Sequence, residues 1–119
     1  MGPGLRLLHD AVVDTHFAQR GRIGRLIAAV VQNPRNLGLG IDEDTAVVLD
    51  GEGRFRVLGS GAVHVVDGAG LTYSSLQFRR RGLLSAFDVR LHVLTEGDGW
   101  EWAARRPQHD GEARAKPSA

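Results

Sequence analysis

Hydrophobic residues recur along this chain with a helical spacing in one segment and a strand-like spacing in several others. Between Ile23 and Val31 they recur every three or four residues, which predicts an amphipathic helix. Asn33-Pro34 predicts the end of this helix, because a residue before proline avoids the helical region. The apolar run before the helix predicts a short strand at Ala11–Asp14. A strand followed directly by a helix is typical of α/β proteins.

Short apolar segments separated by glycine-rich turns follow the predicted helix. Two of them flank Asp50-Gly51-Glu52-Gly53, a connection that predicts a hairpin. Apolar and polar residues alternate in several segments, which indicates strands with one buried face. The segment between Tyr73 and Phe87 fits no single pattern. The predicted strands are Leu37–Ile41, Thr45–Leu49, Arg54–Leu58, Ala62–Val66 and Val89–Leu94, with a last short strand around Trp100 and Trp102.

Composition narrows the class of protein. At 119 residues, of which 42% are apolar, the chain is long enough for one domain with a core. The 15 basic and 14 acidic residues give a net charge of +1, which favours neither a nucleic-acid partner nor a membrane surface. The absence of cysteine excludes disulfides and cysteine metal sites. No apolar run approaches the roughly 20 residues of a membrane span, so we expect a cytoplasmic protein.

The junction between the first strand and the helix carries the candidate chemistry. His16 is the candidate catalytic base, because a histidine can take a proton from a hydroxyl near neutral pH. A helix-capping or partly buried histidine is the alternative. Asp14 could orient His16, cap the helix or bind a cationic substrate group. The two residues are two positions apart, so on an extended backbone their side chains point to the same side.

Charged residues on both sides of the predicted helix are candidates for substrate binding. Guanidinium groups pair with carboxylates through two parallel hydrogen bonds, although a solvated helix face would also carry arginines. An acidic cluster after the next strand could attract a cationic substrate group or could simply form a turn. No histidine is spaced to complete a metal site there. The candidates are Arg20, Arg22 and Arg25 on the helix side, and Asp42, Glu43 and Asp44 in the acidic cluster.

The remaining histidines and one serine are interpreted as structural or solvated residues. Ser60 lies between two glycines, but it lacks the Gly-x-Ser-x-Gly context of a nucleophile elbow. We therefore interpret it as a turn residue. The histidines in this group are His9, His64, His92 and His109.

The residues 14–25 form the pattern Asp-x-His-Phe-x-x-Arg-x-Arg-x-x-Arg. This pattern resembles the signature of cyanophycinase, a serine peptidase family that also contains aspartyl dipeptidase. Four further segments resemble later blocks of the family, in order and with compatible spacing: 38–46, 59–63, 71–76 and 89–94. The resemblance runs from about Leu5 to Trp102, and it covers only the C-terminal part of a full-length family member.

The resemblance implies a fold and a division of the chain. The expected fold is α/β, the C-terminal portion of a class I glutamine amidotransferase-like (flavodoxin-like) fold, with one main helix and several short strands. Residues 1–103 would form the C-terminal part of the peptidase domain. The tail is expected from composition instead: Arg, Pro, Gly, Glu, Lys and Ser dominate beyond Ala103, which predicts a disordered tail over 104–119. The histidine of the motif is the triad base in this family. The triad acid comes from a segment before that histidine, so Asp14 is not assigned this role.

The implied function is hydrolysis of cyanophycin, an arginine-bearing poly-aspartate, to β-aspartyl-arginine dipeptide. His16 would act on a serine, while the arginines, Asp14, Asp42 and Glu43 would bind substrate. The resemblance implies a homodimer and neither cofactor nor metal. Since no Gly-x-Ser-x-Gly motif occurs in the 119 residues, we expect the serine in a missing N-terminal half and the chain to be a fragment. The alternatives are a non-catalytic binding module for acidic or aspartate-arginine peptides and a structural interaction domain.

Overall fold

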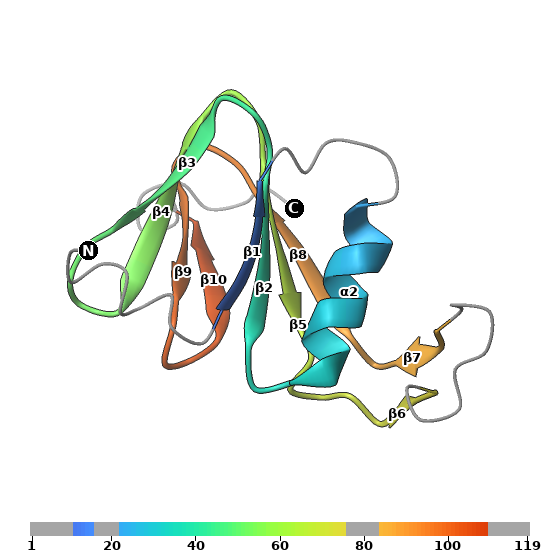
Figure 1. Ribbon diagram of the computed structural model, residues 1–119. Coiled ribbons are helices and arrows are strands. Elements are labelled where there is room, and N and C mark those ends of the chain that lie inside the picture. The colour runs from blue at the N-terminus through green and yellow to red at the C-terminus, as the bar shows by residue number, and fades with distance from the viewer. Residues whose placement is uncertain (1–10, 16–21, 76–83, 110–119) are drawn as a thin grey trace, which may run out of the picture.

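The computed structural model describes residues 11–15, 22–75 and 84–109. Within these ranges the chain forms one helix and ten short strands (Figure 1). The elements in chain order are β1 (Ala11–Thr15), α2 (Arg22–Gln32), β2 (Leu37–Ile41), β3 (Thr45–Leu49), β4 (Arg54–Gly59), β5 (Val63–Asp67), β6 (Tyr73–Ser74), β7 (Ala86–Phe87), β8 (Arg90–Leu94), β9 (Asp98–Glu101) and β10 (Arg106–His109). None of the described segments contains a helix with the length and apolar character needed to cross a lipid bilayer.

The elements are stacked in three layers. The helix α2 covers one face of a four-stranded sheet with the order β1-β2-β5-β8, and a second four-stranded sheet, β10-β9-β4-β3, lies against the other face (Figure 1). The strands β6 and β7 form a separate two-stranded ribbon. Among the described strands, β1 and β2 pair in parallel and all other pairs are antiparallel. The parallel pair is joined through α2, so the first three elements form a β-α-β unit.

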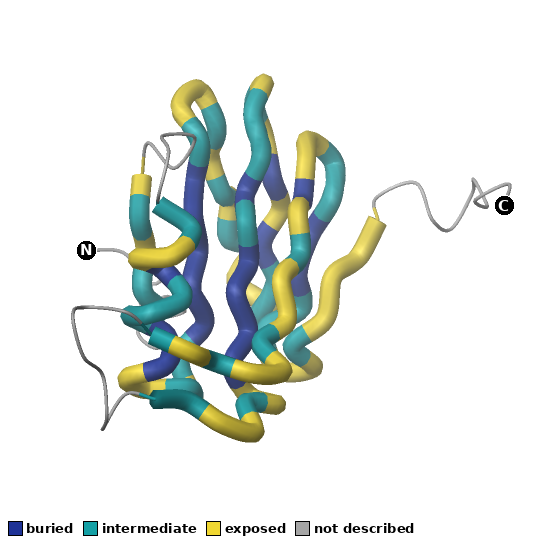
Figure 2. Tube along the Cα trace, turned by 90° about the vertical axis from the view of Figure 1, so that its right-hand side faces the viewer, coloured by how far each residue is buried: buried dark blue, intermediate teal, exposed yellow. Residues whose placement is uncertain are grey.

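The main core lies between the two sheets. Strands β2 and β5 are buried over nearly their whole length because they are covered on both faces (Figure 2). The opposing sheet contributes large side chains, above all Phe55 and Trp100, which are 1% and 0% exposed. The buried members of this cluster are Leu37, Leu39, Ile41, Phe55, Val57, Val63, Val65, Leu94 and Trp100.

A smaller core joins the helix to the first sheet. Leu26 and Val30 of α2 pack on Val66 of β5, with Val12 of β1 at the margin. Gly38 of β2 lies directly beneath the helix, since a Cβ atom built there would come within 2.7 Å of a Val30 methyl group. The predicted apolar stripe of the helix is therefore the surface that holds it on the sheet.

The structure confirms the α/β class, the helix and the predicted strands, whose ends match or differ by one residue. The last strand, predicted around Trp100 and Trp102, spans Asp98–Glu101, so Trp102 lies outside it. The hairpin at 50–53 is present between β3 and β4. The disordered tail predicted over 104–119 is wrong in part, because β10 pairs with β9 and His109 Nδ1 lies 2.7 Å from Asp98 Oδ1. Backbone pairing and this side-chain contact order a segment that has few apolar residues. Residues 110–119 lie outside the described ranges.

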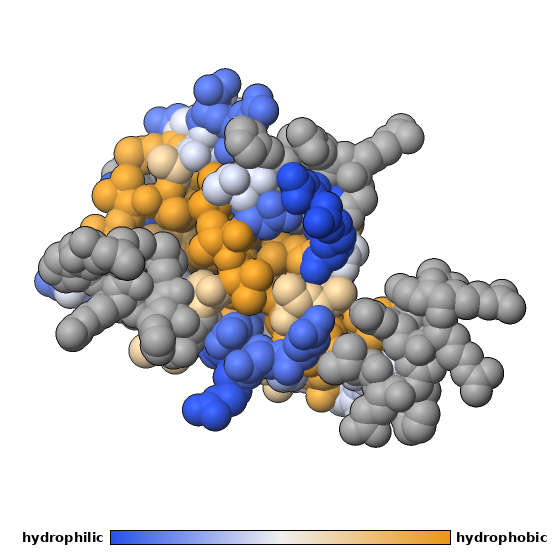
Figure 3. All heavy atoms as spheres, in the orientation of Figure 1, coloured by the Kyte–Doolittle hydropathy of each residue, from blue (hydrophilic) through white to orange (hydrophobic). Residues whose placement is uncertain are grey.

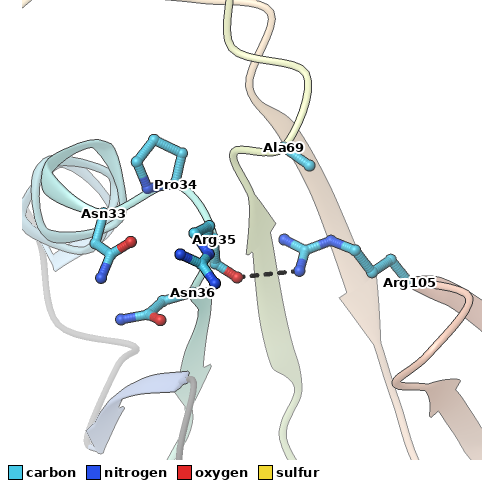
Figure 4. A pocket seen from close by; sticks show the side chains of 6 residues that line it. All are labelled: Asn33, Pro34, Arg35, Asn36, Ala69 and Arg105. Carbon is cyan, nitrogen blue, oxygen red and sulfur yellow. Dashed lines mark hydrogen bonds between the residues drawn. The ribbon is translucent and has the colours of Figure 1, made fainter.

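An ion pair joins Arg105, in the turn before β10, to Asp67, the last residue of β5 in the first sheet. Asp67 is 6% exposed, and its Oδ1 accepts hydrogen bonds from Arg105 Nη2 at 2.7 Å and from the Ala69 N–H at 2.9 Å. Arg105 Nη1 also donates to the carbonyl oxygen of Arg35 at 3.1 Å (Figure 4). Burial raises the pKa of Asp67, but the hydrogen bonds from Arg105 and Ala69 and the positive charge of Arg105 outweigh it, and the pKa is lowered overall.

The substitution Asp67→Asn is expected to lower the free energy of unfolding by about 1–3 kcal/mol at pH 7, because charge-assisted hydrogen bonds are lost. The folded-state pKa of Asp67 lies below its unfolded value. Its ionisation therefore stabilises the fold at neutral pH, and this contribution is lost as the pH falls below about 4. Urea unfolding at pH 7 and pH 3 tests this: the difference between wild type and variant should shrink at pH 3. An undiminished difference, or an equal loss in the exposed control Glu96→Gln, would contradict it.

Candidate functional site

The candidate residues that the structure describes gather at the carboxyl ends of the parallel strands β1 and β2. Asp14 lies beside Gly40 and Thr15 beside Ile41 in the pairing of these strands. The helix α2 begins at Arg22 at the same end, after the connection from β1 (Figure 1). This is the edge at which α/β proteins bind ligands, because strand ends fix side chains there and the first turn of a helix presents free N–H groups.

An ion pair joins the strand to the helix across this edge. Arg22 Nη1 lies 3.3 Å from Asp14 Oδ1, and the side chains are 25% and 21% exposed. Both charges remain in contact with solvent, so each can also meet a charged group of a ligand. The structure thus brings together two residues that the sequence predicted as substrate-binding.

The other residues of the motif are placed less completely. Arg25 follows Arg22 by one helical turn and is exposed. His16 and Arg20 lie outside the described residues. His16 directly follows Thr15, the last residue of β1, so the chain order puts it next to the described part of this edge.

Asp42 supports the turn that leads into β5. Its Oδ2 accepts a hydrogen bond from the Ala62 N–H at 3.0 Å, and Thr45 Oγ1 accepts one from the Gly61 N–H at 2.9 Å. Gly61 fits so closely that an added Cβ atom would come within 2.7 Å of the Asp42 Cβ. The Asp42 Oδ1 atom is buried, and no described residue hydrogen-bonds it. A structural role for Asp42 is therefore established by its contacts, whereas its substrate-binding role stays a prediction.

Glu43 and Asp44 lie in the turn between β2 and β3. Both are exposed, and Asp44 adopts a φ of 57°, in the left-handed region that aspartate tolerates. Thr45 Oγ1 donates a hydrogen bond to the Glu43 carbonyl oxygen at 3.0 Å. The acidic cluster therefore forms the turn that we considered as its alternative interpretation, and its exposed carboxylates remain accessible to a cationic group.

Two substitutions separate the structural role from the binding role within this cluster. Asp42→Ala is expected to lower the free energy of unfolding by about 1–2 kcal/mol, because the Ala62 N–H loses its acceptor. Glu43→Gln alters an exposed side chain, so we expect it to change the free energy of unfolding by less than about 0.5 kcal/mol. Chemical denaturation measures both. Equal losses of stability in the two variants would contradict this assignment, and a raised KM in Glu43→Gln would support substrate binding.

Two surface grooves of the described residues contain none of the predicted site residues. One has a volume of about 630 Å³ and is lined by Asn33, Pro34, Arg35, Asn36, Ala69 and Arg105 (Figure 4). It lies at the far end of α2, about 16 Å along the helix from Arg22 at 1.5 Å per residue. The other, of about 570 Å³, contains the hydrogen-bonded side chains of Asp98 and His109. Among the described residues, no cluster of three histidine or acidic side chains is arranged to hold a metal ion.

The pairing of the strands brings one further polar residue to this part of the sheet that the sequence did not single out. His64 of β5 lies beside Gly40 of β2, on the strand adjacent to the parallel pair. Its segment carries the alternation of an ordinary strand, so it was interpreted as structural or solvated. Only the register between β2 and β5 reveals that it lies in line with Asp14.

The chain is similar to cyanophycinases over most of its length. It is 39% identical to the cyanophycinase of Synechococcus elongatus over 110 residues, which are 92% of this chain and 34% of that protein. It is 43% identical to the cyanophycinase of Trichormus variabilis over 99 residues, 82% of this chain and 33% of that protein. It is 35% identical to the cyanophycinase of Geminocystis herdmanii over 108 residues, 90% of this chain and 40% of that protein.

The predicted resemblance is therefore confirmed, and so is its restriction to a C-terminal part of these proteins. The chain spans between 33% and 40% of the length of the curated relatives it matches. No protein-family model matches the chain.

Proposed function

We propose that this chain is the C-terminal part of a cyanophycinase-type serine peptidase, with residues 1–103 as its share of the peptidase domain. The observation that supports this most is the ion pair of Asp14 and Arg22 at the carboxyl edge of the parallel strands. Thr15, the last residue of β1 at this edge, directly precedes His16 in the sequence. The chain around it is 35–43% identical to cyanophycinases. The complete protein would then have the class I glutamine amidotransferase-like fold.

In the proposed reaction His16 acts as the general base. It takes the proton from a serine hydroxyl while the serine oxygen attacks an amide carbonyl of the poly-aspartate substrate. It then returns this proton to the leaving amine, and a second cycle with water releases the acyl group from the serine. The product is β-aspartyl-arginine dipeptide. Asp14, Arg22 and Arg25, together with Arg20, Asp42 and Glu43, would bind the charged groups of the substrate.

In this proposal the serine comes from outside these residues, and the absence of a Gly-x-Ser-x-Gly motif from the 119 residues supports this. The missing part could pack beside strand β1. Within the described chain, β1 lies at the edge of its sheet, and its residue Val13 is 42% exposed. Hydrophobic residues also gather along this strand on the face shown in Figure 3, beside the hydrophilic first turns of α2. A further strand from the missing part would pair with β1 and hold the serine near His16.

The proposal is tested by incubating the complete gene product with cyanophycin and measuring dipeptide release by mass spectrometry. Release of β-aspartyl-arginine supports the peptidase. Co-sedimentation with the polymer without release would instead support the binding module, which the absence of a serine motif in these residues favours. If the protein neither releases the dipeptide nor co-sediments with the polymer, the structural interaction domain is the remaining alternative.

A further inference from the structure

The groove of about 630 Å³ at the far end of α2 is lined mainly by polar side chains. Residues 33–36, which follow the helix, form one wall, and Arg105 forms the other. In Figure 4 the Arg105 guanidinium extends across the groove toward Arg35. This volume lies within the range of sites that bind small molecules.

Several hydrogen-bond donors around this groove are available to a ligand. The Arg35 side chain is exposed, and its guanidinium pairs with no described residue. The side-chain amides of Asn33 and Asn36 also hydrogen-bond no described residue. Arg105 uses three N–H groups, from Nε and Nη2 to Asp67 Oδ1 and from Nη1 to the Arg35 carbonyl oxygen. A guanidinium has five N–H groups, so two of Arg105 remain for a ligand.

The charges around the groove favour an anion. None of the described residues that line it is acidic. The Asp67 carboxylate behind Arg105 is 6% exposed and is already hydrogen-bonded by Arg105 and by the Ala69 N–H. Arg105 has a backbone φ of 53°, and such left-handed residues persist where their surroundings hold them, often at binding sites. One fixed guanidinium and one unpaired guanidinium thus face the same groove, an arrangement suited to a carboxylate.

A structural role is the alternative for both arginines. Arg105 has such a role, because it holds Asp67. For Arg35 the corresponding role would be to balance the negative end of the helix dipole, an effect that falls off within the last turn. Arg35 lies three residues beyond Gln32, the last residue of α2, and its side chain is exposed. A structural role therefore leaves its guanidinium unexplained.

We propose that this groove binds a carboxylate of the polymeric substrate at a distance from the reacting end. This rests on the proposed function. In a β-aspartyl-arginine unit the arginine is linked through its amino group, so its carboxylate stays free. The groove lies about 16 Å from Arg22 along α2. An extended chain spans about 3.3–3.6 Å per residue, so a polymer needs about five units to reach from that edge to the groove. The groove thus favours long polymers over short oligomers.

The experiment compares hydrolysis of long cyanophycin with hydrolysis of a three-unit oligomer, which is too short to reach the groove, by the complete gene product. Arg35→Gln should raise KM for the polymer by about three- to tenfold, the cost of a partly exposed hydrogen bond between charged groups. The kcat for the polymer and both constants for the oligomer should stay within about twofold of wild type. Arg35→Lys, which keeps the charge without the two-pronged donor, should recover part of the loss.

Arg106→Gln provides the matched control. Arg106 follows Arg105 in the chain and is exposed on β10, but it is not among the residues that line the groove. The substitution removes the same charge from the same part of the surface. Both KM values should therefore stay within about twofold of wild type. An equal rise in KM in Arg106→Gln and Arg35→Gln would overturn the proposal, because it would reveal a general effect of charge.

The outcomes separate this inference from the proposed function. Wild-type protein that neither hydrolyses cyanophycin nor co-sediments with it would overturn both. If the wild type binds the polymer without hydrolysing it, only the peptidase is overturned, and dissociation constants replace KM in the same comparison. An unchanged KM for the polymer in Arg35→Gln would overturn the role of the groove alone. So would an equal rise for polymer and oligomer, which would place the effect of Arg35 at the reacting end.

Discussion

Replacing His16 with alanine is expected to lower the rate of cyanophycin hydrolysis by about 10²–10⁴-fold, the typical contribution of a positioned general base. The reason is that serine is a weak nucleophile until its proton is removed. The loss should appear in kcat, since His16 acts on the reacting serine rather than on the bound polymer. Initial rates of dipeptide release, measured at several polymer concentrations, separate kcat from KM.

The matched control for this experiment is His109→Ala. His109 is exposed and pairs with Asp98 on β9, in a different sheet from Asp14. Its replacement should leave kcat within about twofold of wild type, since changes at exposed sites have small effects. Comparable losses in both variants, or retention of half the activity in His16→Ala, would contradict the role given to His16.

The second large effect concerns stability. Trp100→Ala is expected to lower the free energy of unfolding by about 3–5 kcal/mol, as for other buried aromatic residues. Trp100 is 0% exposed, pairs with Phe55 across β4 and β9, and meets His92 of the other sheet. Removing the indole leaves a cavity between the two sheets that the rigid strands cannot fill. Urea unfolding followed by circular dichroism measures the loss.

Trp102→Ala serves as the comparison. Trp102 is only partly buried, at the margin of the same core, with its ring centroid 6.4 Å from that of Phe55. We expect Trp102→Ala to lower the free energy of unfolding by less than about half as much as Trp100→Ala, because the cost of truncation scales with the buried area removed. A larger loss in Trp102→Ala than in Trp100→Ala would contradict the position assigned to the core.

Much of the fold could be predicted from local patterns. The helix follows from the apolar spacing between Ile23 and Val31 and from the stop signal at Asn33-Pro34. The hairpin at 50–53 follows from its two glycines, Gly51 and Gly53, which adopt positive φ values of 80° and 83°. These features depend on neighbours in the sequence. That β10 forms an ordered strand could not be predicted, since this depends on pairing with β9 and on the hydrogen bond between His109 and Asp98.

The candidate site was predictable only in part for the same reason. Asp14 and Arg22 lie in one motif, and a strand-to-helix connection brings them together. The row of Asp14, Gly40 and His64 depends on the register of three strands, which no local spacing encodes. Asp42 likewise holds a turn 20 positions further along the chain, a contact that its acidic neighbours do not reveal.

The central claim is that these residues supply the base of a peptidase whose serine lies in a segment before them. Peptide mapping by mass spectrometry of the protein purified from its own source tests it most directly. The account predicts peptides that precede Met1, with a Gly-x-Ser-x-Gly serine among them. A mature protein that begins at Met1 or Gly2, and that purifies without a partner carrying such a serine, would contradict it.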